Sequence, residues 1–448
     1  MSQVIIPKAI PARYKQSEAG VIPVDWKALK LDDVCSFIGG AQPEKSTFSY
    51  KLKSGYIRLI QIRDYKSDKY IVYIPEKLAR KKCDENDIMI GRYGPPIFQI
   101  LRGIEGAYNV ALIKTIPNNV INRDFLYYFI KNDKLFELMD MLSQRSSGQT
   151  GVELPALKAY PIALPPKEEQ TAIANALSDM DALLSELEKL IAKKQAIKTA
   201  TMQQLLTGKI RLPAFSLHTE AALKGQPKGT KPSELGEIPE DWEIVPLSDI
   251  CTFGGGTTPP RAQHDRYFVN GSNNWVKTTD LNNSLIRISE ELITDLAISE
   301  TGLKKYPVGT ILVAMYGGFN QIGRTGYITR PSTINQALVA IKPKPKKLNS
   351  YYLLSELNYN VDYWKGVASS SRKDPNITSK DIKNYVIALP LIEEQTAIAT
   401  ILSDMDAEIQ ALKQHLAKTK QIKQGMMQEL LTGKTRLPFD KKIRNTDV

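Results

Sequence analysis

Few residues in this chain have the spacing that catalysis or metal binding requires. The three cysteines and three histidines lie far apart, so none are spaced like the ligands of a metal ion. No GxxxxGK(S/T) loop is present for nucleotide hydrolysis, and the Phe-Gly-Gly-Gly run at 253–256 corresponds to Phe-Ile-Gly-Gly at the matching positions 37–40, so it is not a repeated cofactor loop. The sequence therefore predicts a protein with no catalytic residue and no metal site of its own.

A binding chemistry is carried by loops that combine cationic, tyrosine and amide side chains. The net charge of +12 fits a polyanionic partner. Solvated turns share this composition, so the alternative for any single residue is a plain surface turn. The candidate DNA-binding residues are Arg58, Arg63, Arg92, Tyr93, Arg102 and Arg145 in a first segment, and Lys277, Tyr316, Asn320, Gln321, Arg324, Arg372 and Lys373 in a second.

These candidates divide by the contacts that their side chains can make. Cationic side chains mostly contact phosphates, whereas the paired donor and acceptor of Asn320 or Gln321 can read adenine. Arg145, Arg372 and Lys373 precede strands that run into long helices, and we expect them to hold the backbone of the nucleic acid.

Two long helices are predicted to position the loops. Residues 163–213 and 388–438 align without a gap and are identical at most positions. Each copy begins with proline and acidic residues and ends at Gly208 or Gly433. About 40 helical residues would span roughly 60 Å. The apolar positions form a heptad seam, which predicts an antiparallel coiled coil between the copies; a helix in an unrelated bundle is the alternative. The seam residues are Ile173, Leu177, Met180, Leu184, Leu187 and Ile191, and Ile398, Leu402, Met405, Ile409, Leu412 and Leu416.

The globular segments are duplicated as well. The pattern from Gly20 to Phe37 recurs from Gly236 to Phe253, and β-rich runs precede a helical stretch in both segments. The expected strands are 56–62, 70–74, 87–90 and 110–116 in the first segment and 275–278, 310–314 and 337–342 in the second. The expected helices are 124–141 and 350–365.

The fold class is therefore α+β, with two similar mixed α/β domains joined by two long antiparallel helices and related by a pseudo-two-fold axis. The predicted segments are 1–162 (first recognition domain), 163–213 (central helix), 214–232 (linker), 233–387 (second recognition domain), 388–438 (C-terminal helix) and 439–448 (tail). Two heads on a rod suit a bipartite DNA site, whose halves lie about one turn (~34 Å) or more apart.

Residues near the start of each long helix, chiefly those outside the mutual seam, are predicted to contact partner proteins, because the two copies are more alike than an internal seam requires. The candidates are Glu169, Gln170, Ala172, Ile173 and Ala176 in the first copy, and Glu394, Gln395, Ala397, Ile398 and Ile401 in the second. No apolar run has the length of a membrane span and residues 1–15 lack the order of a signal peptide, so we expect a cytoplasmic protein.

The repeated motifs resemble those of the specificity subunit of type I restriction-modification systems. The resemblance rests on Gly-x-Ile-Pro-x-Asp-Trp at 20–26 and 236–242, Leu-Pro-x-x-Glu-Glu-Gln at 164–170 and 389–395, the glycine-rich turn at 255–259 and the Leu-Leu-Thr-Gly-Lys helix ends. It covers nearly the whole chain. The first segment departs from the usual glycine-rich turn at Gly39-Gly40-Ala41-Gln42-Pro43.

The resemblance implies a non-catalytic reader of double-stranded DNA with two target recognition domains, acting in phage defence. It implies two adenine N6-methyltransferase subunits that use S-adenosylmethionine, and two restriction subunits that use ATP and Mg²⁺, with no cofactor in this chain. The alternatives are the specificity subunit of another restriction or phage-defence methyltransferase system, and a coiled-coil scaffold with no role at DNA. The scaffold does not explain duplicated heads that carry different loops.

Overall fold

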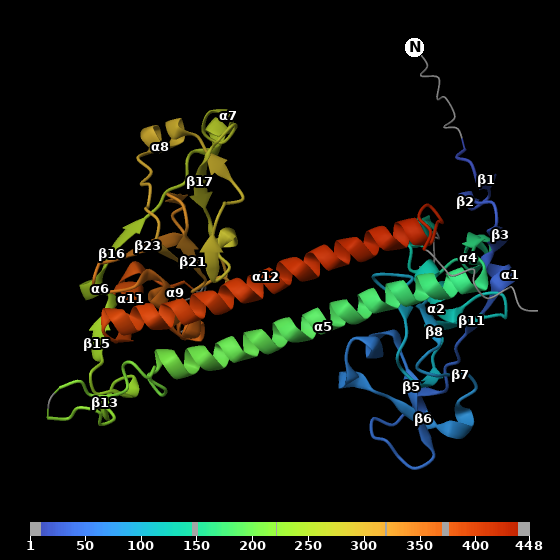
Figure 1. Ribbon diagram of the computed structural model, residues 1–448, viewed down its shortest axis with the longest axis horizontal. Coiled ribbons are helices and arrows are strands. Elements are labelled where there is room, and N and C mark those ends of the chain that lie inside the picture. The colour runs from blue at the N-terminus through green and yellow to red at the C-terminus, as the bar shows by residue number, and fades with distance from the viewer. Residues whose placement is uncertain (1–9, 146–150, 221, 319, 370–375, 438–448) are drawn as a thin grey trace, which may run out of the picture. The chain divides into compact units, whose positions relative to one another are not determined.

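The computed structural model of this chain describes residues 10–145, 151–220, 222–318, 320–369 and 376–437. The chain forms two compact units, unit 1 from Met1–Leu187 with His415–Val448 and unit 2 from Glu188–Gln414. Each unit holds one head and part of each long helix, α5 (Lys167–Leu206) and α12 (Ile392–Leu430) (Figure 1). The predicted mixed α/β class with duplicated heads and two long helices is confirmed.

Head 1 (residues 14–164) contains two four-stranded sheets, ordered β4-β11-β8-β9 and β6-β5-β10-β7. A β1–β2 hairpin precedes them, and the pair β3–β12 leads into α5. The strands are β1 (Tyr14–Ser17), β2 (Gly20–Pro23), β3 (Lys27–Lys30), β4 (Cys35–Gly39), β5 (Tyr56–Ile60), β6 (Tyr73–Pro75), β7 (Lys82–Cys83), β8 (Ile88–Gly91), β9 (Ile100–Leu101), β10 (Gly106–Tyr108), β11 (Leu112–Pro117) and β12 (Pro161–Leu164). The helices are α1 (Leu31–Val34), α2 (Arg123–Ile130), α3 (Asp133–Arg145) and α4 (Leu154–Ala159).

Head 2 (residues 230–389) repeats this plan with a five-stranded sheet, β16-β23-β20-β21-β18, and a three-stranded sheet, β19-β17-β22. The strands are β13 (Thr230–Ser233), β14 (Gly236–Pro239), β15 (Glu243–Pro246), β16 (Cys251–Gly255), β17 (Asn273–Val276), β18 (Ser284–Ile286), β19 (Leu292–Ile293), β20 (Ile311–Ala314), β21 (Thr325–Ile328), β22 (Thr333–Ile334), β23 (Leu338–Pro343) and β24 (Val386–Leu389). The helices are α6 (Leu247–Ile250), α7 (His264–Tyr267), α8 (Asp295–Thr301), α9 (Ser350–Tyr359), α10 (Val361–Ser369) and α11 (Ser379–Lys383).

The prediction of a single helix in each head is wrong, because each predicted helix is broken into two. The expected helix 124–141 forms α2 and α3, and 350–365 falls on α9 and α10. Asparagine marks both breaks: Asn132 accepts a 2.9 Å hydrogen bond from the Leu135 backbone, and Asn360 ends α9. A short amide side chain satisfies free backbone groups at a helix end, so a break there is stable. Most expected strands match β5, β8, β11, β17, β20 and β23 within a few residues, whereas the run 70–74 only overlaps β6 (Tyr73–Pro75).

The long helices pack into the core of the heads as well as against each other. In unit 1, Ile173 and Leu177 of α5 belong to one cluster with Leu430 at the end of α12, with Leu431 directly after it, and with Trp26 of head 1. In unit 2 the cluster around Trp242 contains the equivalent residues of both helices. Both tryptophans are 0% exposed, and each such ring buries roughly 150–250 Å². No helix in the described part of the chain has the length and hydropathy of a membrane span.

Helix α9 buries a carboxyl group where head 1 has an aromatic ring. Counted from the helix N-caps Asn122 and Asn349, Glu356 occupies the position of Phe129. Its Oε1 accepts a 2.8 Å hydrogen bond from Asn360, and its Oε2 has no partner among the described residues. Burial raises the pKa of Glu356 to about 8, although the hydrogen bond opposes this shift. The carboxyl is therefore mostly protonated at neutral pH.

The stability of unit 2 should consequently fall with rising pH. Because the folded pKa of about 8 lies above the reference value of 4.5, this contribution is fully present below about pH 4.5 and is lost as pH rises through about 8. Glu356→Gln, which is neutral throughout, should remove a decline on the order of a few kcal/mol. Urea unfolding between pH 6 and 9 measures it, with exposed Glu243→Gln as the matched control. An equally steep decline in Glu356→Gln would contradict the assignment.

Candidate nucleic-acid interface

In unit 1 a buried carboxylate joins the start of α5, the start of head 1 and the segment after α12. Glu169 is 0% exposed, and its Oε2 accepts a 3.0 Å hydrogen bond from Trp26 Nε1. Arg436 donates to both oxygens of Glu169, at 2.8 and 2.5 Å, and to both oxygens of Asp25, at 2.8 and 2.9 Å. A buried carboxylate is costly unless it is paired and hydrogen-bonded, and this one is both. We name these four residues the unit 1 clasp.

Unit 2 contains the same arrangement, the unit 2 clasp. Trp242 Nε1 donates to Glu394 Oε2 at 3.1 Å. Arg211, which follows α5, donates to both oxygens of Glu394 at 2.6 and 2.7 Å and to both oxygens of Asp241 at 2.8 and 3.1 Å. Lys228 adds a 2.8 Å contact to Asp241. Burial alone would raise the pKa of Asp241, but the bonds from Arg211 and Lys228 lower it to about 2.

The glycine of each Thr-Gly-Lys helix end is required by close packing on these clasps. Gly433 has φ +71°, and a Cβ there would lie 2.6 Å from Pro23 Cδ. Gly208 has φ +68°, and a Cβ there would lie 2.4 Å from Pro239 Cγ. Any other residue would be strained in conformation and would clash. The Thr-Gly-Lys and Ile-Pro motifs, far apart in sequence, are therefore two sides of one contact.

The glutamine of each Glu-Glu-Gln motif joins a long helix to a helix of the head by hydrogen bonds: α5 to α2 in unit 1, and α12 to α9 in unit 2. Gln170 Oε1 accepts a 2.6 Å bond from the Asn122 backbone, and its Nε2 donates to Pro165 O at 2.9 Å. In unit 2, Gln395 Oε1 accepts a 2.9 Å bond from the Asn349 backbone. These amides fix the N-termini of α2 and α9, so their function is internal.

Burial corrects part of the predicted partner surface. Six of its ten residues are at most 2% exposed, because they hold the clasps, the amide ties or the core: Glu169, Gln170, Ile173, Glu394, Gln395 and Ile398. The remaining four are half-buried: Ala172, Ala176, Ala397 and Ile401. The likeness of the two helix copies therefore follows largely from anchoring within the chain.

A second matched contact fixes the helices to each other inside each unit. In unit 1, Lys423 of α12 pairs with Asp181 of α5, which also accepts a 2.9 Å bond from Tyr128. In unit 2, Lys198 of α5 pairs with Asp406 of α12 at 2.5 Å. The helix ends that meet in each unit therefore run antiparallel, as predicted.

Three cationic DNA candidates are engaged inside their own heads. Arg58 pairs with Asp68 at 2.9 Å and Asp64 at 3.7 Å. Arg102 pairs with Asp124 at 2.5 Å and lies over the Tyr127 ring. Lys277 pairs with Glu290 at 3.3 Å and Glu291 at 3.5 Å. Their charge is largely compensated locally, so a DNA contact by Arg58, Arg102 or Lys277 would compete with these ion pairs, and their role at DNA stays a prediction.

Four candidates remain available on the loops of the two heads. Arg63 is exposed beside the Tyr70 ring. After β8, the Arg92 guanidinium lies over the Tyr93 ring at 5.3 Å. Tyr316, which follows β20, is 43% exposed. Arg63, Arg92, Tyr93 and Tyr316 therefore stay predicted DNA contacts.

The other loop candidates of head 2 differ in availability. Arg324 Nε donates to Asn320 O at 3.0 Å, while the Asn320 side chain is exposed. Gln321 is half-buried, and its Oε1 lies 2.3 Å from where a Cβ on Gly317 would be. Its amide therefore packs inside the loop. The side chain of Arg145, and Arg372 and Lys373, lie outside the described residues.

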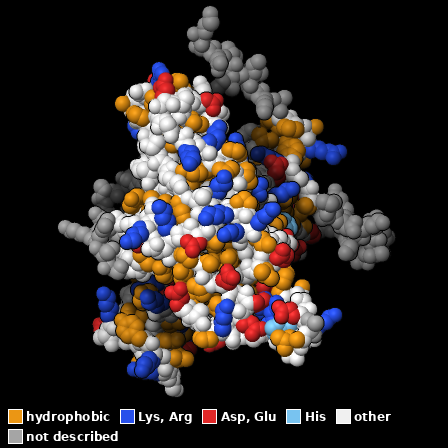
Figure 2. All heavy atoms as spheres, turned by 90° about the vertical axis from the view of Figure 1, so that its left-hand side faces the viewer, with side chains coloured by type: hydrophobic (Ala, Val, Ile, Leu, Met, Phe, Trp, Pro, Cys, Tyr) orange, Lys and Arg blue, Asp and Glu red, His pale blue; other side chains and the backbone are white. Residues whose placement is uncertain are grey.

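Figure 2 views the protein from the side on which head 2 lies in Figure 1. Lysine and arginine side chains gather over the middle of this face, whereas acidic side chains are concentrated lower down. A field of this sign suits a phosphate backbone. Among the described residues no group of three or more His, Cys, Asp and Glu could hold a metal ion. The three cysteines are buried, and burial raises the pKa of each thiol.

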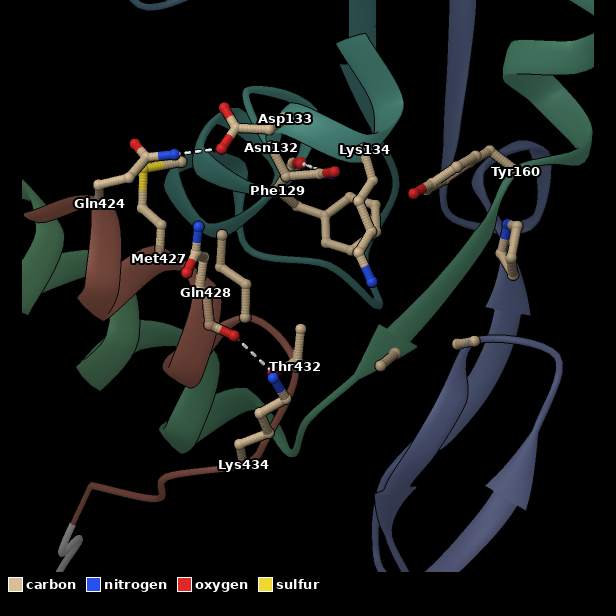
Figure 3. Close-up of a pocket in the computed structure, with 14 residues that line it drawn as sticks. Phe129, Asn132, Asp133, Lys134, Tyr160, Gln424, Met427, Gln428, Thr432 and Lys434 are labelled. Atoms are coloured by element: carbon tan, nitrogen blue, oxygen red, sulfur yellow. Dashed lines mark hydrogen bonds between the residues drawn. The ribbon is translucent and has the colours of Figure 1, made fainter. Parts of the chain in front are cut away.

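A cavity of about 380 Å³ lies in unit 1 beside the last turns of α12. Figure 3 shows Met427, Gln428 and Thr432 of this region facing Phe129 and Asn132 from the α2–α3 corner. Its lining combines apolar side chains with amides and charged groups, and none of the sequence-predicted site residues lines it. Sequence reasoning missed it because its walls come from three distant stretches of the chain.

Removing a clasp arginine should destabilise its unit strongly. Arg211→Met would leave Glu394, 2% exposed, without its charged partner, which costs roughly 3–5 kcal/mol. Urea unfolding at pH 7 tests this against Arg330→Met, an exposed arginine of the same head. Arg436→Met should do the same to unit 1 through Glu169. Equal stability of the Arg211 and Arg330 variants would show that the clasp does not hold the fold.

The comparisons with known proteins fit this architecture. The family described as type I restriction modification DNA specificity domain matches residues 23–199 and 239–424. The chain is 28% identical to a putative type I restriction enzyme MjaX specificity subunit of Methanocaldococcus jannaschii, over 95% of this chain and 97% of that protein. It is also 28% identical to the type I restriction enzyme MjaVIII specificity subunit of that organism, over 95% of this chain and 96% of that protein.

A solved structure has the same fold. The crystal structure of a type I restriction-modification system S subunit from M. genitalium matches with a TM-score of 0.59 and 16% identity, over 91% of this chain and 96% of that chain. The two regions matched by the family contain most of both heads and of both long helices. The chain therefore belongs to the family of type I restriction-modification DNA specificity domains.

Proposed function

We propose that this specificity subunit reads double-stranded DNA with both heads, each head reading one half of a gapped, asymmetric site. The observation that supports this most is the repeat itself. Both units hold the same clasp around a similar head, whereas the loops after β8 and β20 carry different side chains. Equal scaffolds with unequal loops suit a bipartite site whose halves differ in sequence.

The chemistry is assigned to partner subunits in this proposal. Two methyltransferase subunits would use S-adenosylmethionine to modify adenine N6, and two restriction subunits would use ATP and Mg²⁺ to translocate and cleave DNA. The cationic side chains of this chain would position the duplex through phosphates, which makes binding dependent on salt. The exposed Asn320 amide is a candidate for a base edge.

Docking of the methyltransferase is assigned to the half-buried small residues of the helices. Ala172 and Ala397 occupy matching places in α5 and α12, one turn from the clasp glutamates. In unit 2, α5 also exposes Leu190 at 38% and Ile197 at 41%, one heptad apart. Small and apolar positions at this spacing accept a partner helix.

Head exchange tests the division of labour. Replacing residues 14–160 by those of a relative with a different target should change one half of the methylated sequence and leave the other half intact, because each head carries its own loops. Methylome sequencing of a host that contains the complete system reads both halves at once. Simultaneous change in both halves would show that the heads are not independent readers.

Charge substitution tests the docking surface. Ala172→Glu and Ala397→Glu should each weaken co-purification with the methyltransferase, because a carboxylate would be desolvated between helices. Gln226→Glu, in the exposed linker, is the control. Size-exclusion chromatography of the co-expressed subunits gives the stoichiometry. A complex of unchanged composition with both alanine variants would refute this surface.

A further inference from the structure

Matching backbone hydrogen bonds follow β8 in head 1 and β20 in head 2, at the same edge of the central sheet. After β8, Arg92 donates its backbone N–H to Ala111 O at 2.8 Å and accepts a 3.1 Å bond from the Val152 backbone. After β20, Met315 donates to Ala337 O at 2.9 Å and accepts a 3.2 Å bond from Ile377. The turns that carry Tyr93 and Tyr316 are therefore held at matching places, each beside the start of a neighbouring strand.

A third strand in each head ends at the same edge of the sheet. The residue that follows it is a glycine, and no larger residue fits there. At Gly40, which follows β4, a Cβ would lie 2.0 Å from Asn109 O. At Gly256, which follows β16, it would lie 1.9 Å from Ile334 O. The close backbone approach continues to residue 257, whose N–H donates to Ile334 O at 3.2 Å. It brings Gln42 in head 1 and Thr258 in head 2 to the edge that carries the tyrosines.

The side chains at this edge differ between the heads. In head 2, Thr258 Oγ1 donates a hydrogen bond to Oε1 of the exposed Gln336, which precedes Ala337. In head 1 the matching residue before Ala111 is Val110, which is 42% exposed. One backbone arrangement thus presents an oriented amide in head 2 and an apolar surface in head 1.

We propose that Gln336, oriented by Thr258, is a base-reading side chain of head 2; this rests on the proposed function. A glutamine amide offers a donor and an acceptor together, which matches the N7 and N6 groups of adenine in the major groove. The bond from Thr258 restricts the rotamers of Gln336 before DNA arrives, so less side-chain entropy is lost on binding. Gln321, by contrast, is turned into its own loop.

A base-reading role at this position also accounts for the difference between Gln336 in head 2 and Val110 in head 1. Val110 has no hydrogen-bonding group and fits an apolar contact such as the thymine methyl group. Thr258 is a positioning residue, since it reaches the base only through Gln336. The two heads therefore prefer different bases, although the backbone at this edge of the sheet is the same in both.

The experiment uses the full chain in complex with its methyltransferase subunit. The wild-type target is first defined by methylome sequencing, and Gln336→Ala is then sequenced in the same host. Relaxed or altered preference at one or two positions in a single half of the target is expected. On a duplex that carries the wild-type target, Gln336→Ala should bind about 5- to 100-fold more weakly, with no change on a scrambled duplex. Gln226→Ala is the matched control.

Further variants separate orientation from structure. Thr258→Val should relax the same positions as Gln336→Ala, whereas Thr258→Ser should keep the wild-type target. Equal thermal unfolding of all variants shows that head 2 is folded. An unchanged target in Gln336→Ala overturns the assignment of Gln336 alone. A wild-type complex that methylates no defined target would instead overturn the proposed function.

Discussion

A buried carboxylate on the first turn of each long helix is the constraint on which both units depend. Glu169 and Glu394 have almost no contact with solvent, so each must be surrounded by donors or the unit cannot fold around a charge. The donors come from a tryptophan of the head and from an arginine beyond the end of the opposite helix. One carboxylate thereby fixes the start of one long helix, the head and the end of the other long helix. The positions of the loops depend on this junction.

The elements visible in the sequence were those whose signals are local or repeated. Heptad spacing and terminal glycines place α5 and α12 within a few residues, and the duplicated Asp-Trp motif marks both heads. The clasps were not predictable, although every member lies in a motif that the alignment of copies reveals. Their residues meet only through tertiary contact, such as the one between Asp25 and Arg436.

The candidate site was harder to predict for the same reason. The sequence around a loop arginine does not show whether its side chain faces solvent or pairs with an aspartate. The pairing of the neighbouring strands decides between the two. Arg58 meets Asp64 and Asp68 across a short turn, so its charge is satisfied. The single helix expected in each head failed at an asparagine, whose capping tendency competes with apolar periodicity that continues beyond it.

The heads differ inside as well as at their loops. Head 2 buries Glu356 where head 1 has Phe129. It also holds Arg261 over the Phe268 ring at 4.4 Å and near the Trp275 ring at 5.3 Å, in a cluster beside α7. The clasps, in contrast, keep the same tryptophan, glutamate, arginine and aspartate. The two heads thus differ in their interiors while the helix junctions keep the same four residue types.

The origin of each clasp arginine has a consequence for how such a gene can change. Arg211 belongs to the first copy of the repeat but neutralises Glu394 of the second, and Arg436 of the second copy neutralises Glu169 of the first. A substitution at either end of one copy is therefore felt by the other copy. Each copy of the repeat therefore completes a charge balance in the other, so a change to a clasp residue of one copy calls for a compensating change in the other.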